Sequence, residues 1–108
     1  MKFSIRLMAL FVMFSASAHA ADKTLDIYFI DVEGGQSTLI VTPKKESLLI
    51  DAGYAGDGQG GSVDDPSKAR DANRILAAAR DAHINKIDYL LITHFHRDHV
   101  GGVPELSQ

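Results

Sequence analysis

Three short apolar runs, each five to eight residues long and each followed by a turn-forming stretch, constrain the fold of this chain more than any other feature. They occupy residues 25–32, 37–42 and 47–51. Such runs, rich in β-branched and aromatic residues, are typical of strands. The polar stretch 43–46 between the second and third run is short enough to join antiparallel strands. The sequence therefore predicts a β-meander at the start of the fold.

A single helix and a fourth strand follow the meander. Asp65 is a good N-cap and Pro66 suits the first helical position, after a Gly- and Asp-rich surface loop at 53–65. We expect the helix to end near His83 and a compact buried strand to occupy 87–93. This order of elements indicates a layered α/β fold, with one helix face packed on the sheet. The apolar residues that recur at helical spacing on that face are Ala69, Ala72, Ile75, Leu76 and Ala79.

The stretch directly after the fourth predicted strand contains four candidate metal ligands within six residues. His94 and His96 are two residues apart, so in an extended chain both imidazoles project to one side. A turn at Asp98 and His99 would aim those two side chains in another direction, which suits a second ion close by. The glycine pair 101–102 permits a sharp backbone path there, and the proline that follows fits the start of another helix.

Composition limits what this cluster can bind. The chain contains no cysteine, so imidazole and carboxylate groups must hold any metal ion. That donor set favours zinc and tolerates iron or manganese. A net charge of −3, with Lys44 and Lys45 as the longest basic run, does not indicate stable nucleic-acid binding.

The pattern His94-x-His96-x-Asp98-His99, after an apolar strand and before two glycines, resembles the signature loop of the metallo-β-lactamase superfamily. The segments 31–37 and 49–53 also resemble the first strands of that family, in the expected order. The resemblance implies a partial αββα sandwich, of which this chain holds the first half: the β-meander, the helix, the strand and the metal loop.

The resemblance also implies a role for each site residue. His94 and His96 would bind a first metal ion, and Asp98 and His99 a second. Asp51 would lie under the metal loop and orient the ligands. The activity implied is that of a hydrolase in which a metal-activated hydroxide attacks an ester, thioester, amide or phosphodiester bond of a small-molecule substrate. Asp98 would accept or pass the proton, and the complete domain would hold two zinc ions, with iron or manganese as alternatives.

The first twenty residues have the form of a bacterial export signal. Lys2 and Arg6 precede an apolar run at 7–14, and Ala18-His19-Ala20 has the small-x-small form that signal peptidase accepts. We expect cleavage after Ala20, which removes His19, and a periplasmic or secreted product that is free of the membrane. An uncleaved anchor is the alternative, but the apolar run is too short to cross a bilayer.

The family's site draws further histidine and aspartate ligands from residues downstream of the metal loop. We therefore expect residues 21–108 to be the N-terminal part of a truncated domain, inactive or very weak by itself. We also expect one sheet face and the inner side of the helix to expose apolar surface and promote association. The sequence leaves the oligomeric state open.

Several narrower interpretations stay open. The segment 31–37 resembles the exported branch related to DNA-uptake competence proteins, although Gln36 stands where that branch commonly carries aspartate. A β-lactam substrate is compatible with a periplasmic location. A non-catalytic periplasmic binding or structural module that retains the metal loop is the alternative to an enzyme.

Two further features suggest sites at first sight. The glycines of 56–61 match G-x-G-x-x-G, but they lie too far from the preceding strand and the following helix for a dinucleotide turn. We interpret them as a flexible loop, with a substrate-facing lid as the alternative. His83, at the expected end of the helix, is interpreted as a surface residue and not as a ligand.

Overall fold

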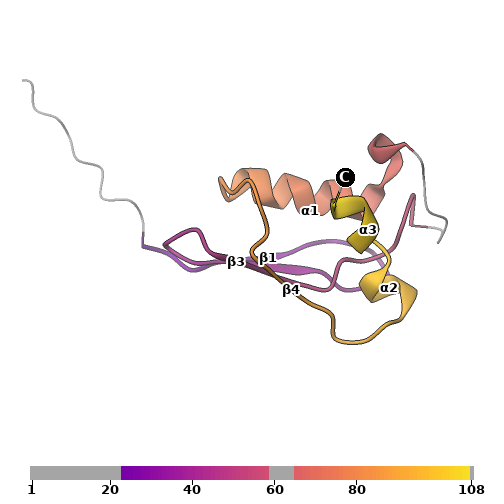
Figure 1. Cartoon of the computed structure of the whole chain (residues 1–108), viewed down its shortest axis with the longest axis horizontal. Helices are drawn as coiled ribbons and strands as arrows, with labels where there is room; N and C mark the ends of the chain where they lie inside the picture. The colour runs from indigo at the N-terminus through magenta and orange to yellow at the C-terminus, as the bar shows by residue number, and fades with distance from the viewer. Residues whose placement is uncertain (1–22, 59–64, 108) are drawn as a thin grey trace, which may run out of the picture.

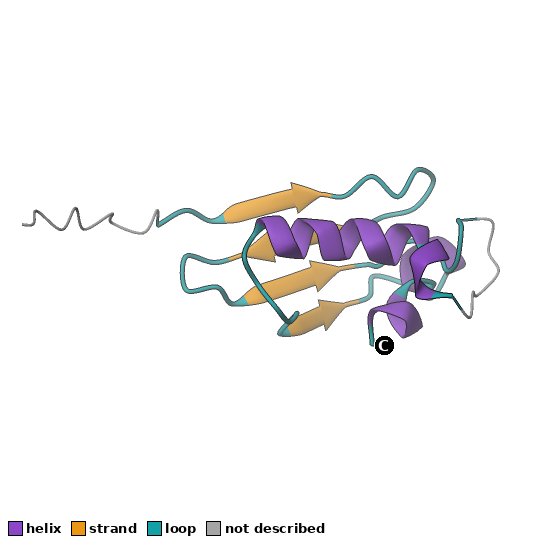
Figure 2. Ribbon diagram, turned by 90° about the horizontal axis from the view of Figure 1, so that it is seen from above, coloured by secondary structure: helices purple, strands orange, loops and turns teal. Residues whose placement is uncertain are grey.

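The computed structural model describes residues 23–58 and 65–107. Four strands form one sheet in the order β1-β2-β3-β4 (Figure 2). The first three are antiparallel neighbours, as the predicted meander requires, and β4 runs parallel to β3. The α/β fold class is therefore confirmed, but each strand is shorter than the apolar run that predicted it. The strands are β1 (Asp26–Phe29), β2 (Thr38–Val41), β3 (Ser47–Ile50) and β4 (Tyr89–Leu91).

One long helix, α1 (Arg70–Asp81), lies across one face of this sheet (Figures 1 and 2). The metal loop continues into a single turn of helix, α2 (Arg97–Val100), which the sequence did not predict. The last element, α3 (Val103–Leu106), has a proline in its first turn, as predicted, and packs beside α1. The chain from β4 onward thus folds back over the carboxyl ends of β3 and β4.

The start of the helix differs from the prediction. Asp65 does act as an N-cap, because its carboxylate accepts a hydrogen bond from the Ser67 amide, but it caps only a 3-10 turn, η1 (Pro66–Lys68). Ala69 then leaves the helical conformation. The amide of Arg70 donates at 2.7 Å to the carbonyl of Gly56, across the loop, so a tertiary hydrogen bond interrupts the helix.

His83 lies in the cap at the C-terminal end of α1. The amides of His83 and Ile84 bond back to the carbonyls of Arg80 and Ala79, at 3.0 Å each, which is the hydrogen-bond pattern of a Schellman cap. His83 has a φ of 55° and takes the left-handed position of that cap. Its exposed side chain agrees with the interpretation as a surface residue.

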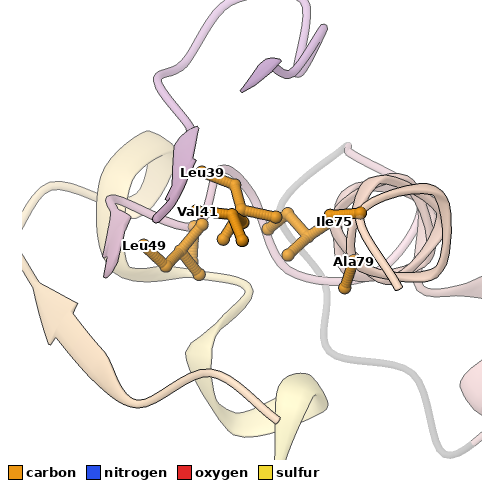
Figure 3. Close-up of a cluster of buried hydrophobic side chains, with 7 residues drawn as sticks. Leu39, Val41, Leu49, Ile75 and Ala79 are labelled. Carbon is orange, nitrogen blue, oxygen red and sulfur yellow. The ribbon is translucent and has the colours of Figure 1, made fainter. Parts of the chain in front are cut away.

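The core lies between α1 and the sheet (Figure 3). Leu39 and Leu49 face each other across β2 and β3 and are fully buried against Ile75 and Ala79 of the helix. Ala69 and Ala72 are buried as predicted. The prediction that Leu76 packs on the sheet with the other apolar residues of the helix is wrong, because Leu76 is 37% exposed and lies beside an open groove. It adjoins the buried stripe on the helix, and in the described part of the chain β4 is the last strand on that edge of the sheet.

The opposite face of the sheet is apolar and open. The register aligns Ile27 with Tyr89 and Phe29 with Leu91 across the four strands, and these side chains are between 46% and 83% exposed. The predicted exposure of one sheet face is therefore confirmed. The predicted exposure of the inner side of the helix is wrong, since that side forms the core. No helix in the described part of the chain is both long and apolar enough to cross a bilayer.

Some predictions concern residues that the structure does not describe. The export signal at 1–20, with its cleavage site and His19, lies outside the described residues, as do the last three residues of the 56–61 glycine pattern. Within the described part, β3 ends at Ile50 and α1 begins only at Arg70, which agrees with the argument against a dinucleotide turn.

Candidate metal centre

The predicted ligands come together beyond the end of β4. His94 and His96 lie on the loop between β4 and α2, and Asp98 and His99 lie in α2 itself. Ligand atoms of His94, His96 and Asp98 lie within 4.8 Å of one another. The ring of His99 is 3.8 Å from that of His94, centroid to centroid, and its Nε2 is 3.6 Å from Asp98 Oδ2. The structure therefore gathers all four side chains into one cluster.

The donor set fits a divalent transition metal. Three imidazoles and one carboxylate are of the borderline hardness that suits zinc and also tolerates iron or manganese. The rings of His94 and His96 are exposed, so an ion can reach them from solvent. A single ion within reach of His94, His96 and Asp98 would have three protein ligands, the number that an open catalytic zinc site keeps.

Asp51 lies under this cluster as the resemblance implied. It is fully buried just after β3 and has a φ of 58°, a left-handed conformation that aspartate tolerates better than most residues. Its Oδ1 accepts a hydrogen bond from the Thr93 amide at 2.8 Å, and its Oδ2 accepts one from the Thr93 hydroxyl at 2.6 Å. Nδ1 of His99 lies 2.7 Å from the same Oδ2. One buried carboxylate therefore holds both the end of β4 and a predicted ligand.

The ionisation of Asp51 follows from these contacts. Burial is the largest single influence and acts to raise its pKa, because desolvation disfavours the charged form. The hydrogen bonds from His99 and Thr93 together outweigh burial and hold the pKa of Asp51 below its ordinary value. Asp51 is therefore an anion at neutral pH and can act only as a hydrogen-bond acceptor.

Main-chain contacts fix the position of α2. The Gln36 amide donates to the Asp98 carbonyl at 3.1 Å, and the Ala52 amide donates to the His99 carbonyl at 2.7 Å. A Cβ on Gly35 would collide with the Asp98 carbonyl, so this approach requires glycine. The side-chain amide of Gln36 donates to the Thr38 hydroxyl at 2.9 Å. The turns after β1 and β3 thus clamp the backbone of the two C-terminal ligands.

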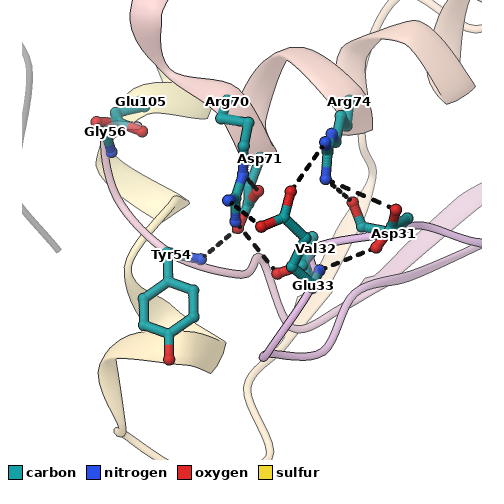
Figure 4. A network of polar contacts seen from close by, with 9 residues as sticks. All are labelled: Asp31, Val32, Glu33, Tyr54, Gly56, Arg70, Asp71, Arg74 and Glu105. Carbon is teal, nitrogen blue, oxygen red and sulfur yellow. Dashed lines mark hydrogen bonds and ion pairs between the residues drawn. The ribbon is translucent and has the colours of Figure 1, made fainter. Parts of the chain in front are cut away.

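A polar network behind the cluster holds those turns in place (Figure 4). Asp71 is fully buried, accepts a hydrogen bond from the Tyr54 amide at 2.8 Å and pairs with Arg70 at 2.7 Å. Arg70 also bonds Glu33 at 2.7 Å and the Val32 carbonyl at 3.2 Å. Helix α1 therefore anchors the turn that contains Gly35, although none of these residues belongs to the cluster.

Two parts of this arrangement are not predicted from the sequence. Thr93 belongs to the predicted fourth strand, although its position directly before His94 is a signal for a side chain close to the site. Arg70 and Asp71 carry no such signal, because each is an ordinary charged residue in sequence and acquires its partner only through the tertiary fold.

Comparison with known proteins agrees with this geometry. A family model described as the metallo-beta-lactamase superfamily matches residues 30–108, which is more than half of the chain. A curated relative, the lactamase-like protein aptB of Emericella nidulans, is 39% identical over 72 residues. The match covers 67% of this chain but only 19% of that protein. No solved structure matched the chain significantly.

Proposed function

The chain belongs to the metallo-beta-lactamase superfamily, and on this premise we propose that it provides the first metal-binding loop of a metal-dependent hydrolase. The observation that carries the proposal is the convergence of three imidazoles and one carboxylate above a buried aspartate. A bound divalent cation supplies Lewis acidity and makes a water nucleophilic near neutral pH. The roles below follow from the residues that would hold it.

His94 and His96 are proposed as ligands of one ion, and Asp98 and His99 as ligands of a second. Asp98 lies within reach of both groups, since its carboxylate is close to the His94 and His96 ligand atoms and 3.6 Å from His99. The same carboxylate can accept a proton and pass it on. Asp51 keeps its charge buried beneath the ligands and orients His99. Zinc is the proposed metal, with iron or manganese as alternatives.

The proposed substrate is a small molecule with an ester, thioester, amide or phosphodiester bond. The cluster is open to solvent, because the rings of His94 and His96 are exposed, so a small substrate can reach it. The matched relative is named as lactamase-like, so a cyclic amide is one substrate to test. The likeness of 31–37 to the competence-protein branch makes a phosphodiester another.

We further propose that the protein is exported and acts in the periplasm or outside the cell. The support for this is the charged and apolar pattern of residues 2–14 and the Ala18-His19-Ala20 sequence. N-terminal sequencing of the exported product tests it, and a product that begins at Met1 would contradict the proposal.

Metal binding by the chain is the direct test. Zinc is titrated into chelator-treated protein against a chromophoric competitor, for the wild type, His94→Ala with His96→Ala, and the control His83→Ala. We expect the double variant to lose affinity by more than the roughly 10- to 100-fold that an outer partner contributes. The control should bind like the wild type. Equal affinities for all three proteins, or no binding by the wild type, would contradict the proposal.

Activity is tested on the zinc-loaded protein with a lactam, a lactone, a thioester and a phosphodiester. Hydrolysis that is lost in the double variant supports an enzyme. Tight, stoichiometric zinc binding without any hydrolysis, in a protein extended downstream of residue 108 as well, would favour a non-catalytic module instead.

A further inference from the structure

We propose that Thr93 is a positioning residue that, together with Asp51, fixes the ring proton of both His94 and His99 on Nδ1 and so presents Nε2 of each to the metal. The inference rests on the proposed function and deepens it. It concerns the tautomers of His94 and His99 in the metal-free protein, which Thr93 and Asp51 determine.

The hydroxyl of Thr93 lies between the Asp51 carboxylate and the rings of His94 and His99. Its Oγ1 is 2.6 Å from Asp51 Oδ2, 3.2 Å from His94 Nδ1 and 3.4 Å from His99 Nδ1. Its main-chain amide is held by Asp51 Oδ1 at 2.8 Å. The hydroxyl therefore has a fixed position, and the one freedom left to it is the direction of its single proton.

The direction of that proton follows from the partners. A threonine hydroxyl has one hydrogen to donate and lone pairs to accept with, whereas a carboxylate only accepts. Two oxygens 2.6 Å apart repel each other unless a hydrogen lies between them, so the Thr93 hydroxyl must donate to Asp51. Its lone pairs then face His94. The Nδ1 of His94 can complete this contact only by carrying a hydrogen of its own.

His99 obeys the same constraint directly. Its Nδ1 lies 2.7 Å from the Asp51 carboxylate and must therefore carry a hydrogen. Its Nε2 is on the other side of the ring, 3.6 Å from Asp98, which is where a ligand nitrogen is needed. The hydrogen bond made by one ring nitrogen decides which nitrogen is free to bind a metal. Asp51 thus fixes the tautomer of His99 by direct contact and the tautomer of His94 through the Thr93 hydroxyl.

His96 is an internal control, because its ring makes no hydrogen bond to any residue that the structure describes. Its neighbour in the cluster is the ring of His94, at a centroid distance of 4.7 Å. We therefore expect the tautomer of His96 to be insensitive to changes at Thr93.

The test compares Thr93→Val, which keeps the shape and removes the hydroxyl, with Thr93→Ser, which keeps the hydroxyl. Long-range nitrogen–proton NMR of the imidazoles, on the metal-free chain at a pH where histidine is neutral, reports which nitrogen carries the hydrogen. We expect Nδ1–H on His94 and His99 in the wild type and in the serine variant. In the valine variant His94 should shift toward Nε2–H, while His96 stays unchanged.

Zinc affinity is the second measurement. We expect the valine variant to bind about 10- to 100-fold more weakly than the wild type, as for loss of an outer hydrogen-bond partner, and the serine variant to stay within a few-fold. Nε2–H on His94 in the folded wild type overturns the inference, even if the valine variant does not fold. Unchanged affinity and tautomer in a folded valine variant overturn it as well.

These outcomes are separate from those of the proposed function. Zinc binding without any effect of Thr93→Val would leave the hydrolase proposal intact and remove the positioning role. The expected tautomers in a wild-type chain that binds no zinc would support the positioning role and remove the metal-dependent function.

Discussion

Replacement of Asp51 with asparagine removes a buried charge while the shape of the side chain is kept. Asparagine also tolerates the left-handed φ of 58°, so the backbone conformation is not at issue. The amide oxygen can keep the hydrogen bond from the Thr93 amide. The amide nitrogen, however, takes the place of Oδ2 and points a donor at the Thr93 hydroxyl and at Nδ1 of His99.

The cost follows from these contacts. Two hydrogen bonds to a charged group are lost, at about 1.5–3 kcal/mol each. Reorientation of the Thr93 hydroxyl and relief of the desolvation of a fully buried carboxylate reduce the sum, so we expect a net loss of about 3 kcal/mol. With a urea dependence of roughly 1.5 kcal/mol per molar, the unfolding midpoint should fall by about 2 M.

Urea unfolding of chelator-treated protein, followed by far-ultraviolet circular dichroism, measures this shift. Asp26→Asn, which removes the same charge from β1, is the control and should change the midpoint little. A shift in Asp51→Asn below about 0.5 M, or one no larger than in the control, would refute the claim that Asp51 holds the loop by charge-assisted hydrogen bonds.

Three other predictions test the fold around the site. Ile75→Ala, at a fully buried position of α1, should lower the unfolding free energy by about 2–5 kcal/mol, and Leu76→Ala, at its exposed neighbour, by less than about 1 kcal/mol. Thermal unfolding compares the two, and equal losses would contradict the core described above. Gly35→Ala, whose Cβ meets the main chain of the metal loop, should cost about 1–3 kcal/mol and weaken zinc binding in a calorimetric titration. Gly34→Ala, whose Cβ has no neighbour nearer than 3.8 Å, should leave both unchanged. The pKa of Asp88 is held below its ordinary value of 3.8, first by a hydrogen bond from Lys86. The stabilising effect of the Asp88 carboxylate is therefore present above pH 3.8 and is lost as the pH falls through the lower pKa of the folded state. Asp88→Asn should therefore make acid unfolding, followed by circular dichroism, less steep in this range, and an unchanged acid transition would contradict it.

Local patterns predicted most of the elements. The meander, the buried stripe of Ala72, Ile75 and Ala79 and the proline at the start of α3 depend on neighbours within a few residues, and all were confirmed. Asp65 is an N-cap as predicted, but of a 3-10 turn and not of the helix. The predictions for the helix were wrong where its structure or burial depends on segments distant in sequence. The hydrogen bond from the Arg70 amide to the Gly56 carbonyl splits the predicted helix, and Leu76 lies beside an open groove instead of in the core.

The sequence by itself determined the layered α/β class, the metal-binding residue types and their spacing, because periodicity and ligand chemistry are local properties of the chain. Only the tertiary structure decided how those residues are held. The pairing of β4 with β3 brings Thr93 over Asp51, 42 positions away in sequence, and one buried carboxylate then orients side chains that no local pattern connects. Hydrogen-bond direction depends on distances of a few tenths of an ångström, and such distances are set only when the separate segments pack together.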